Sequence, residues 1–211
     1  MEYPIIPEKT AMLFFDTLNI YLKPTNPAPD VAPKIEAQIA AMKKMEVACR
    51  EAGIVLFYGQ ADHRPDGKDF WPHVVDLGYG GTPGQPPFKT AAPGVVANSW
   101  GAEVIEELAP QPADYVIKKH RWSTFFQTHM ELSLRTAGID TLMLAGGSTE
   151  IGIASTAYAA RDLNYHQIIL RDACRSGRPG MDDFWMDKVF PGFCRVMTVD
   201  EAISLFAVPV S

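Results

Sequence analysis

Short apolar runs alternate with longer amphipathic stretches along this chain, and this alternation restricts its fold more than any other feature. The runs that predict strands are 11–15, 53–59, 114–118, 141–146, 166–170 and 194–199. Several are apolar without the alternation of a half-exposed strand, as in strands buried on both faces. Helical patterns follow four of these runs, at 30–52, 125–138, 149–164 and 200–206. This order predicts an α/β fold, in which helices cover both faces of a parallel sheet.

The ends of the helical patterns carry residues that fit helix boundaries. Gly53 follows the longest pattern, where a left-handed C-cap glycine is common. Asp200 begins the last pattern and is suited to cap a helix N-terminus. With 211 residues the chain is long enough for a substantial core, and we expect one domain over 1–211.

Charge, apolar runs and cysteines exclude several classes of partner. A formal net charge of -6 argues against a surface that binds nucleic acid or an acidic membrane. No apolar run approaches about 18 residues, so we expect no membrane span. The first residues lack the basic and apolar parts of a secretory signal. The three cysteines form no CxxC pair, so we expect neither a disulfide framework nor a zinc site, and we predict a cytoplasmic protein.

A proline- and glycine-rich segment, 76–99, interrupts the alternation with the sequence DLGYGGTPGQPPFKTAAPGVVANS. A loop of this length inside a domain usually has a function. We interpret it as a lid over a site or as a contact between subunits.

The predicted topology also indicates where a ligand binds. In an open parallel sheet, ligands bind beyond the carboxyl ends of the strands. The residues expected there are Asp16, Gln60, Lys118, Lys119, the segment 146–152 and Asp172.

Asp16 directly follows the first apolar run. A carboxyl group at the end of a buried strand suits a general acid or base, although an aspartate there can also cap the next turn. Lys118 and Lys119 point to opposite faces if their strand continues, so only one of them can face Asp16. That lysine would orient the carboxylate and stabilise developing negative charge, whereas the other would be a solvated strand end.

The stretch GQADHRPDGKDFWPH suggests a metal site, with the candidates Asp62, His63, Asp66, Asp69 and His73. Hydrolase sites of this kind need an aspartate two residues before the first histidine, where this chain has Ala61. We therefore expect no metal and interpret the stretch as a polar loop beside the pocket. Gln60 and Arg64 could instead bind a polar or anionic substrate, because a guanidinium group suits a carboxylate.

The stretch GGSTEIGIAST, residues 146–156, joins a predicted strand to a predicted helix. Backbone N–H groups at such a helix start can bind an anion or an oxyanion without any side chain. The alternative is an ordinary glycine turn. No GKS or GKT follows and GxGxxG is absent, which argues against a nucleotide-phosphate loop and a dinucleotide. We expect no cofactor.

Two blocks of sequence carry an ordered set of motifs. They are AMLFFDTLNIYL (11–22) and the stretch 118–174, which contains K-x-R-[YW]-S-x-F-x-x-T, G-I-x-T-L, G-x-x-T, T-A-x-x-A and D-A in that order. In these motifs the chain resembles the isochorismatase-like hydrolase superfamily, also called the cysteine hydrolases. The resemblance covers nearly the whole chain. It implies a Rossmann-like three-layer α/β/α fold with a six-stranded parallel sheet, in a homo-oligomer (a dimer or a tetramer).

Most members of this family use an aspartate, a lysine and a cysteine in catalysis. Asp16 and Lys119 match the first two, whereas Gly152 stands at the cysteine position. The resemblance therefore implies that a thiol nucleophile is missing, and we expect the space at Gly152 to admit a water or a bulkier substrate. True isochorismatases also have glycine there, and they hydrolyse a vinyl ether to a dihydrodiol and pyruvate.

The resemblance also implies residues that bind the substrate. Gln60 and Arg64 stand where isochorismatases carry a glutamine and a substrate-binding arginine. Family members share a non-proline cis peptide before the cysteine position, which here would join Gly147 to Ser148. Two residues depart from the isochorismatases, because Ser148 replaces a common tyrosine and Leu18 a common glutamine. These departures leave the substrate open.

Together these observations predict a hydrolase for a small cyclic or carboxylate-bearing molecule, in which Asp16 protonates an enol ether and no covalent enzyme intermediate forms. Lys119 would orient Asp16, and the N–H groups of Ser148 and Gly152 would hold a substrate oxygen. Two alternatives stay open: an amide, ester or imide hydrolase in which Asp16 activates water, and a small-molecule-binding protein without catalysis. Five aromatic residues suit either a wall for a ring-bearing ligand or the core: Trp71, Trp100, Trp122, Phe125 and Phe126.

Overall fold

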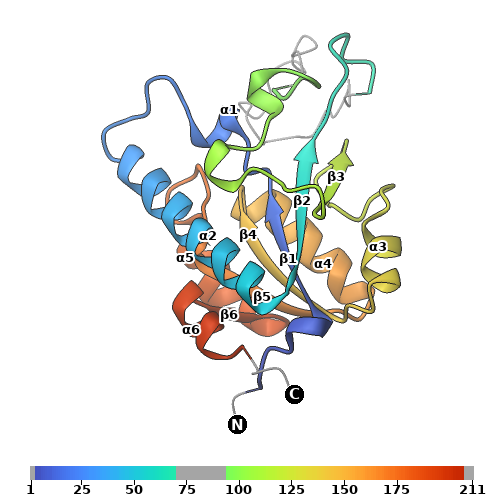
Figure 1. The fold of residues 1–211 in the computed structure, drawn as a ribbon. Helices are drawn as coiled ribbons and strands as arrows, with labels where there is room; N and C mark the ends of the chain where they lie inside the picture. The colour runs from blue at the N-terminus through green and yellow to red at the C-terminus, as the bar shows by residue number, and fades with distance from the viewer. Residues whose placement is uncertain (1–2, 70–93, 207–211) are drawn as a thin grey trace.

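A parallel sheet forms the centre of the structure, a computed structural model that describes residues 3–69 and 94–206 (Figure 1). Its strands are β1 (Thr10–Phe15), β2 (Val55–Ala61), β3 (Tyr115–Lys119), β4 (Thr141–Gly146), β5 (His166–Cys174) and β6 (Arg195–Met197). They lie in the order β3-β2-β1-β4-β5-β6, and every neighbouring pair is parallel. The predicted six-stranded parallel sheet is therefore confirmed.

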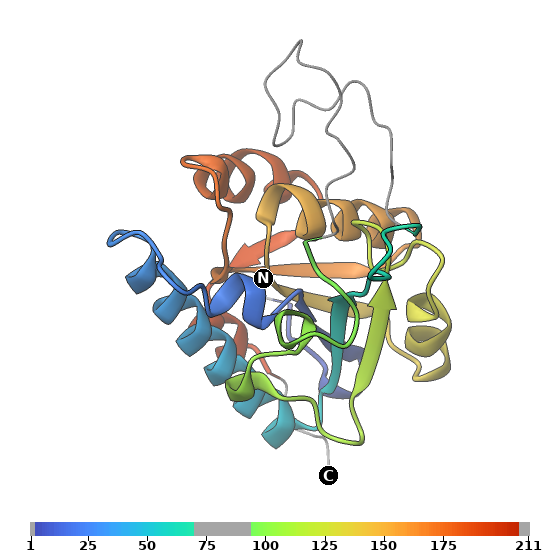
Figure 2. The same ribbon diagram turned by 90° about the horizontal axis from the view of Figure 1, so that it is seen from above.

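Helices cover both faces of this sheet, so the fold has three layers (Figure 2). The four longest are α2 (Ala32–Ala52), α3 (Met130–Thr136), α4 (Ala154–Asp162) and α6 (Val199–Ser204). Alternate residues of β1 enter different cores: Met12 and Phe14 share one cluster with Met42 of α2, and Leu13 shares the other with Ala157 of α4. Both faces of β1 are therefore buried, which explains its unbroken apolar sequence.

The ends of two helices test the predicted boundaries. Helix α2 ends at Gly53, whose φ of 73° gives the left-handed C-cap that we predicted. The prediction that Asp200 caps the last helix is wrong, because Thr198 is the N-cap of α6. Its hydroxyl accepts a hydrogen bond from the Glu201 N–H (3.2 Å), and the Glu201 carboxylate accepts one from the Thr198 N–H (2.7 Å). This reciprocal capping box satisfies two N–H groups at once, which a cap at Asp200 would not.

Other elements begin later than predicted or were not predicted. Helix α3 starts at Met130 because Gln127, with φ of 53°, turns the chain out of helical geometry first. The pattern 149–164 begins as a π-helical turn, η4 (Thr149–Ile153), before α4. The short helices α1 (Asn19–Leu22) and α5 (Met181–Phe184) are too brief to show a helical periodicity.

Several sequence predictions concern residues outside the described ranges. They include most of the segment 76–99, His73 and Trp71. Within the described ranges, no helix has the length and apolar character needed to cross a membrane.

Candidate active site

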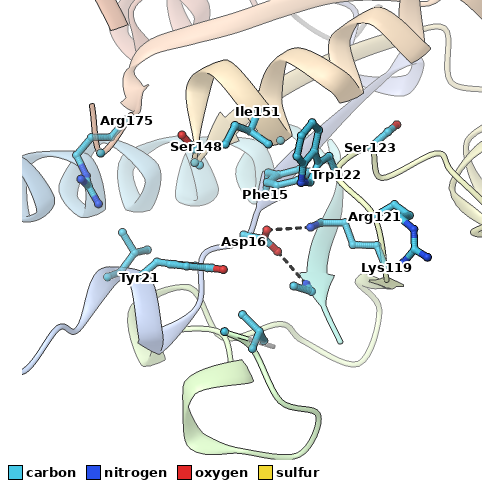
Figure 3. Close-up of a pocket in the computed structure, with 18 of the residues that line it drawn as sticks. Phe15, Asp16, Tyr21, Lys119, Arg121, Trp122, Ser123, Ser148, Ile151 and Arg175 are labelled. Carbon is cyan, nitrogen blue, oxygen red and sulfur yellow. Dashed lines mark hydrogen bonds and ion pairs between the residues drawn. The ribbon is translucent and has the colours of Figure 1, made fainter. Parts of the chain in front are cut away.

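A cavity of about 890 Å³ lies at the edge of the sheet where the strands end (Figure 3). The last residue of each of four strands lines it: Phe15 of β1, Ala61 of β2, Lys119 of β3 and Gly146 of β4. Arg175, directly after β5, lines it as well. The order of the strands reverses between β1 and β4, and a parallel sheet opens a crevice for ligands at such a point.

Asp16 and Lys119 form a nearly buried ion pair in this cavity (Figure 3). Lys119 Nζ donates to Asp16 Oδ2 at 2.8 Å, and the N–H of Ala61 donates to Oδ1 at 2.8 Å. The two side chains are 10% and 4% exposed. The ammonium group also lies 4.2 Å from the centroid of the Phe15 ring, whose face attracts a cation. Both oxygens of Asp16 thus accept a hydrogen bond, as an ionised carboxylate does.

The backbone at Asp16 aims this carboxylate. Asp16 leaves β1 with φ of 47°, in the left-handed region that few residues other than glycine adopt. Its N–H donates to the carbonyl oxygen of Gly59 at 2.8 Å, which holds the turn against β2. The carboxylate therefore crosses the end of β2 and reaches Lys119 on the next strand.

The alternation of side chains along β2 and β3 decides which polar residues face the cavity. The register pairs Gln60 with Lys118 and Ala61 with Lys119. Successive side chains of a strand point to opposite faces, so Ala61 and Lys119 share the cavity side. The structure thus brings Lys119 to Asp16, while the Lys118 side chain is 47% exposed. Gln60 is not among the described residues that line the cavity.

Arg64 lies in the loop after β2, and its side chain is 63% exposed. Its Nε and Nη2 donate to the two carboxylate oxygens of Asp66 at 2.9 and 2.7 Å. Arg64 is likewise absent from the described lining of the cavity. Because its guanidinium group already holds a carboxylate, binding a substrate there requires Arg64 to leave Asp66.

Gly152 lines the cavity, but the position that its side chain would take is occupied. A Cβ atom at Gly152 would lie 2.1 Å from Cε1 and 2.4 Å from Cζ of Phe15, far inside van der Waals contact. The expectation that Gly152 makes room for a water or a bulkier substrate is therefore wrong. The aromatic ring of Phe15, at the end of β1, occupies the volume that a side chain at position 152 would need.

The end of β4 and the first residue after it bring two glycines close to neighbouring strands. Gly146 has φ of 125°, and a Cβ atom there would lie 2.0 Å from the carbonyl oxygen of Phe15. A Cβ atom on Gly147 would lie 2.8 Å from the carbonyl oxygen of Arg175. The peptide between Gly147 and Ser148 is cis, as the resemblance implied, and both residues line the cavity.

Sequence reasoning missed Arg175. The predicted strand ended at residue 170, which directed attention to Asp172, but β5 continues to Cys174. The Asp172 carboxylate instead accepts a hydrogen bond from the N–H of Val199 (2.9 Å) at the start of α6. Extending the strand through the apolar pair Ala173 and Cys174 would have placed Arg175 at the strand end.

Comparison with known proteins identifies the family. The isochorismatase domain family matches residues 10–201. This chain belongs to the isochorismatase family. The isochorismatase family protein YwoC of Bacillus subtilis (strain 168), which is uncharacterized, is 30% identical over 195 residues, 92% of each chain. The ureidoacrylate amidohydrolase RutB of Azorhizobium caulinodans is 30% identical over 189 residues, which cover 82% of this chain and 78% of RutB.

A solved structure agrees with this family assignment at the level of the fold. The isochorismatase family protein from Burkholderia thailandensis has a TM-score of 0.77 and 24% identity, over 97% of this chain and 98% of that one. The family consists of hydrolases, RutB among them, so this chain is an isochorismatase-family hydrolase.

The candidate metal ligands that the structure describes in this isochorismatase-family chain do not converge. In the ranges 3–69 and 94–206, no three His, Cys, Asp or Glu side chains gather as they would around a metal ion. Burial lowers the pKa of His63, although the Asp69 carboxylate, 3.7 Å from its Nδ1, acts in the opposite direction. His73 lies outside the described residues.

None of the three cysteines of the isochorismatase-family chain lines the described cavity. Cys49 and Cys174 are buried, and burial raises the pKa of both thiols. Cys194 is partly buried, and burial raises its pKa to about 12. Because the thiolate is the nucleophilic form, none of these thiols is poised for attack.

The predicted aromatic residues that the structure describes lie in three different environments. Trp122 and Phe126 line the cavity, together with Tyr21 of α1, which was not predicted. Phe125 packs against the core between the sheet and α3 and α4. Trp100 is exposed and is not among the residues that line the cavity.

Proposed function

We propose that the protein hydrolyses the enol (vinyl) ether of a small, ring-bearing carboxylate by acid catalysis, with no covalent enzyme intermediate. The observation that carries this proposal is the contact of Gly152 with Phe15. An aromatic ring fills the place where a nucleophilic side chain at position 152 would stand. This contact supports a reaction in which water attacks the substrate directly. We place the chain, on this ground, in a branch of the family that works without cysteine.

In the proposed reaction, Asp16 carries a proton in the substrate complex and donates it to the terminal carbon of the enol ether. The electrons of the double bond form the new C–H bond, and the carbon that bears the ether oxygen becomes an oxocarbenium ion. Water adds to this carbon and returns a proton to Asp16. The hemiketal then breaks its C–O bond, its hydroxyl proton passes to the leaving oxygen, and an alcohol and a keto acid are released.

Lys119 has two roles in this proposal. It orients Asp16 through the 2.8 Å hydrogen bond to Oδ2. The carboxylate that the enol ether itself carries, and that leaves in the keto acid, competes with the Asp16 carboxylate for the charge of this ammonium group. This favours the protonated carboxyl group that the first step needs. After proton transfer, the ionised Asp16 stabilises the cation electrostatically, and the N–H groups of Ser148 and Gly152 hold a substrate oxygen.

Pyruvate release from isochorismate, coupled to lactate dehydrogenase, tests the proposal. We expect turnover by the unaltered protein and a loss of about 100-fold or more in Asp16→Asn, since general acid catalysis contributes that much. Lys119→Met and Lys118→Met form a matched pair, because the neighbouring lysine lies outside the cavity lining. Only Lys119→Met should lose activity. Full activity of Asp16→Asn, or no pyruvate from folded protein, would reject the enol-ether reaction.

One observation favours a second function, the hydrolysis of an amide, ester or imide. Both oxygens of Asp16 accept hydrogen bonds, so the ionised carboxylate is placed to take a proton from water and activate it for attack. The relative RutB is named as an amidohydrolase of ureidoacrylate. Ammonia or acid released from such substrates, without pyruvate from isochorismate and dependent on Asp16, would support this function over the first.

A further inference from the structure

The sheet itself fixes the position of Arg175 at the cavity. Its N–H donates to the carbonyl oxygen of Gly146 at 3.0 Å. Its own carbonyl oxygen lies so close to Gly147 that a Cβ atom there would approach it to 2.8 Å. The Arg175 side chain is half-buried and lines the cavity. Its direction is therefore set by two strand ends and does not depend on a long loop.

Gln38 holds one edge of the Arg175 guanidinium group. Gln38 lies on α2 and is 3% exposed. Its Nε2 donates to the carbonyl oxygens of Gly146 (3.0 Å) and Ala173 (3.3 Å), so its Oε1 faces Arg175 and accepts a hydrogen bond from Nε at 3.1 Å. Within the described ranges, the two terminal nitrogens of Arg175 donate to no protein acceptor. A guanidinium group bound at Nε alone keeps one side for a ligand.

Among the residues that the structure describes, no carboxylate forms an ion pair with Arg175. Asp182 lies nearby, but its carboxylate accepts hydrogen bonds from the Ser176 N–H (2.9 Å) and the Thr149 hydroxyl (2.6 Å). Burial lowers the pKa of Arg175, and the field of Asp182 opposes this. An arginine remains charged in proteins, so this half-buried cation gains electrostatic stabilisation when an anion arrives.

The other cavity cations are already engaged. Lys119 is paired with Asp16, and Arg121 donates to the backbone carbonyl oxygens of Asp69 and His120. Figure 3 shows Arg175 and Lys119 on opposite sides of the cavity, with Asp16 between them. An anion at Arg175 therefore lies at a distance from the proton-transfer pair.

The cavity walls between these two ends suit a ring. Tyr21, Trp122 and Phe126 contribute aromatic surface to a cavity of about 890 Å³. Apolar walls with a few placed polar groups are typical of small-molecule sites. A flat ring can pack against them while a carboxylate on that ring reaches Arg175 and the opposite edge of the ring faces Asp16.

We propose that Arg175 is the carboxylate-binding residue of this site and that Gln38 positions its guanidinium group. The two terminal nitrogens of Arg175 donate hydrogen bonds to one carboxylate of a small ring-bearing acid. This inference rests on the proposed function in one respect, namely that the same cavity holds the substrate. The binding step itself needs no turnover, so it is tested separately from catalysis.

Benzoate and its neutral counterpart benzamide are suitable probes, with binding measured by isothermal titration calorimetry. We expect the full-length protein to bind benzoate more tightly than benzamide. Arg175→Gln should weaken benzoate binding by about tenfold or more, which is typical of a charge-assisted hydrogen-bonded pair, and leave benzamide binding unchanged. Arg175→Lys keeps the charge without the two-pronged geometry and should fall between the two. Gln38→Met should weaken benzoate binding less than Arg175→Gln and spare benzamide binding.

Two arginine variants serve as controls. Arg171→Gln removes the same charge from the exposed side of β5, where Arg171 pairs with Asp187, and should change benzoate affinity by less than about twofold. Arg121→Gln removes a cavity charge at the far side from Arg175 and should also keep most of the affinity. Urea denaturation of each variant confirms that it is folded.

Three results would overturn the assignment of Arg175. They are no benzoate binding by the unaltered protein, equal benzoate affinity in Arg175→Gln and Arg171→Gln, or a loss confined to Arg121→Gln. The proposed function fails on a different result, which is turnover that survives Asp16→Asn. Benzoate binding that depends on Arg175 would stand in that case, so the two failures are distinguishable.

Discussion

Adding one methyl group at Gly152 should destabilise the protein, because the ring of Phe15 already fills that space. The new Cβ atom would lie 2.1, 2.4 and 2.9 Å from three atoms of the ring, whereas carbon atoms in contact lie about 3.5–4 Å apart. The ring must therefore move by more than about 1 Å. Phe15 is 1% exposed, so its ring packs closely against its neighbours and resists this displacement. Overpacking of this kind costs about 1–3 kcal/mol.

Helix propensity opposes part of this cost. Alanine is better than glycine inside a helix by about 1 kcal/mol, so we expect Gly152→Ala to lower the free energy of unfolding by up to about 2 kcal/mol. In a Phe15→Ala background the obstacle is gone, and the same change should be neutral or should stabilise by up to about 1 kcal/mol. The double-mutant cycle therefore predicts a coupling of about 2 kcal/mol between the two positions.

Urea denaturation followed by tryptophan fluorescence measures all four corners of this cycle. Phe15→Ala alone should cost about 3–5 kcal/mol, and Phe15→Leu offers a milder background if that protein is too unstable. Gly192→Ala is a suitable control, because no atom lies within 4 Å of the added Cβ position. A coupling energy near zero would refute the reasoning, since it would mean that the Phe15 ring does not occupy the space at Gly152.

Three further predictions follow from other contacts. Gly152→Cys alone should gain no thiol-dependent amidase activity, and any such activity should need Phe15→Ala as well, measured as ammonia release with and without a thiol-blocking reagent. Thr198→Ala removes the capping box of α6 and should cost about 1 kcal/mol by urea denaturation. Burial raises the pKa of Glu46, but the hydrogen bonds from Lys43 and Arg50 lower it by more, so the pKa lies below its ordinary value of 4.5. The ionised Glu46 therefore stabilises the fold above pH 4.5, and this contribution is lost as the pH falls below that value. Glu46→Gln should flatten the loss of stability between about pH 5 and 3.

The order of the strands and helices was readable because each buried strand of a parallel sheet is apolar on both faces, and each covering helix has its own period. The same regularity selected Asp16 together with Lys118 and Lys119, since the carboxyl ends of parallel strands meet at one edge. The family motif then singled out Lys119. Helix starts were less predictable. Thr198 competed with Asp200 for the cap of α6, and Gln127 delayed α3, because both outcomes depend on local backbone geometry that several sequences allow.

Sequence alone determined the α/β architecture, the family and the pair Asp16 and Lys119, because these depend on periodicity along the chain and on motifs within it. Only the tertiary structure decided what surrounds that pair. Phe15 fills the space at Gly152 although the two residues lie far apart in the sequence, and Arg175 gains its place from Gln38 on a distant helix. Such contacts join residues far apart in the sequence, and their fit depends on distances of a few ångströms that no local pattern records.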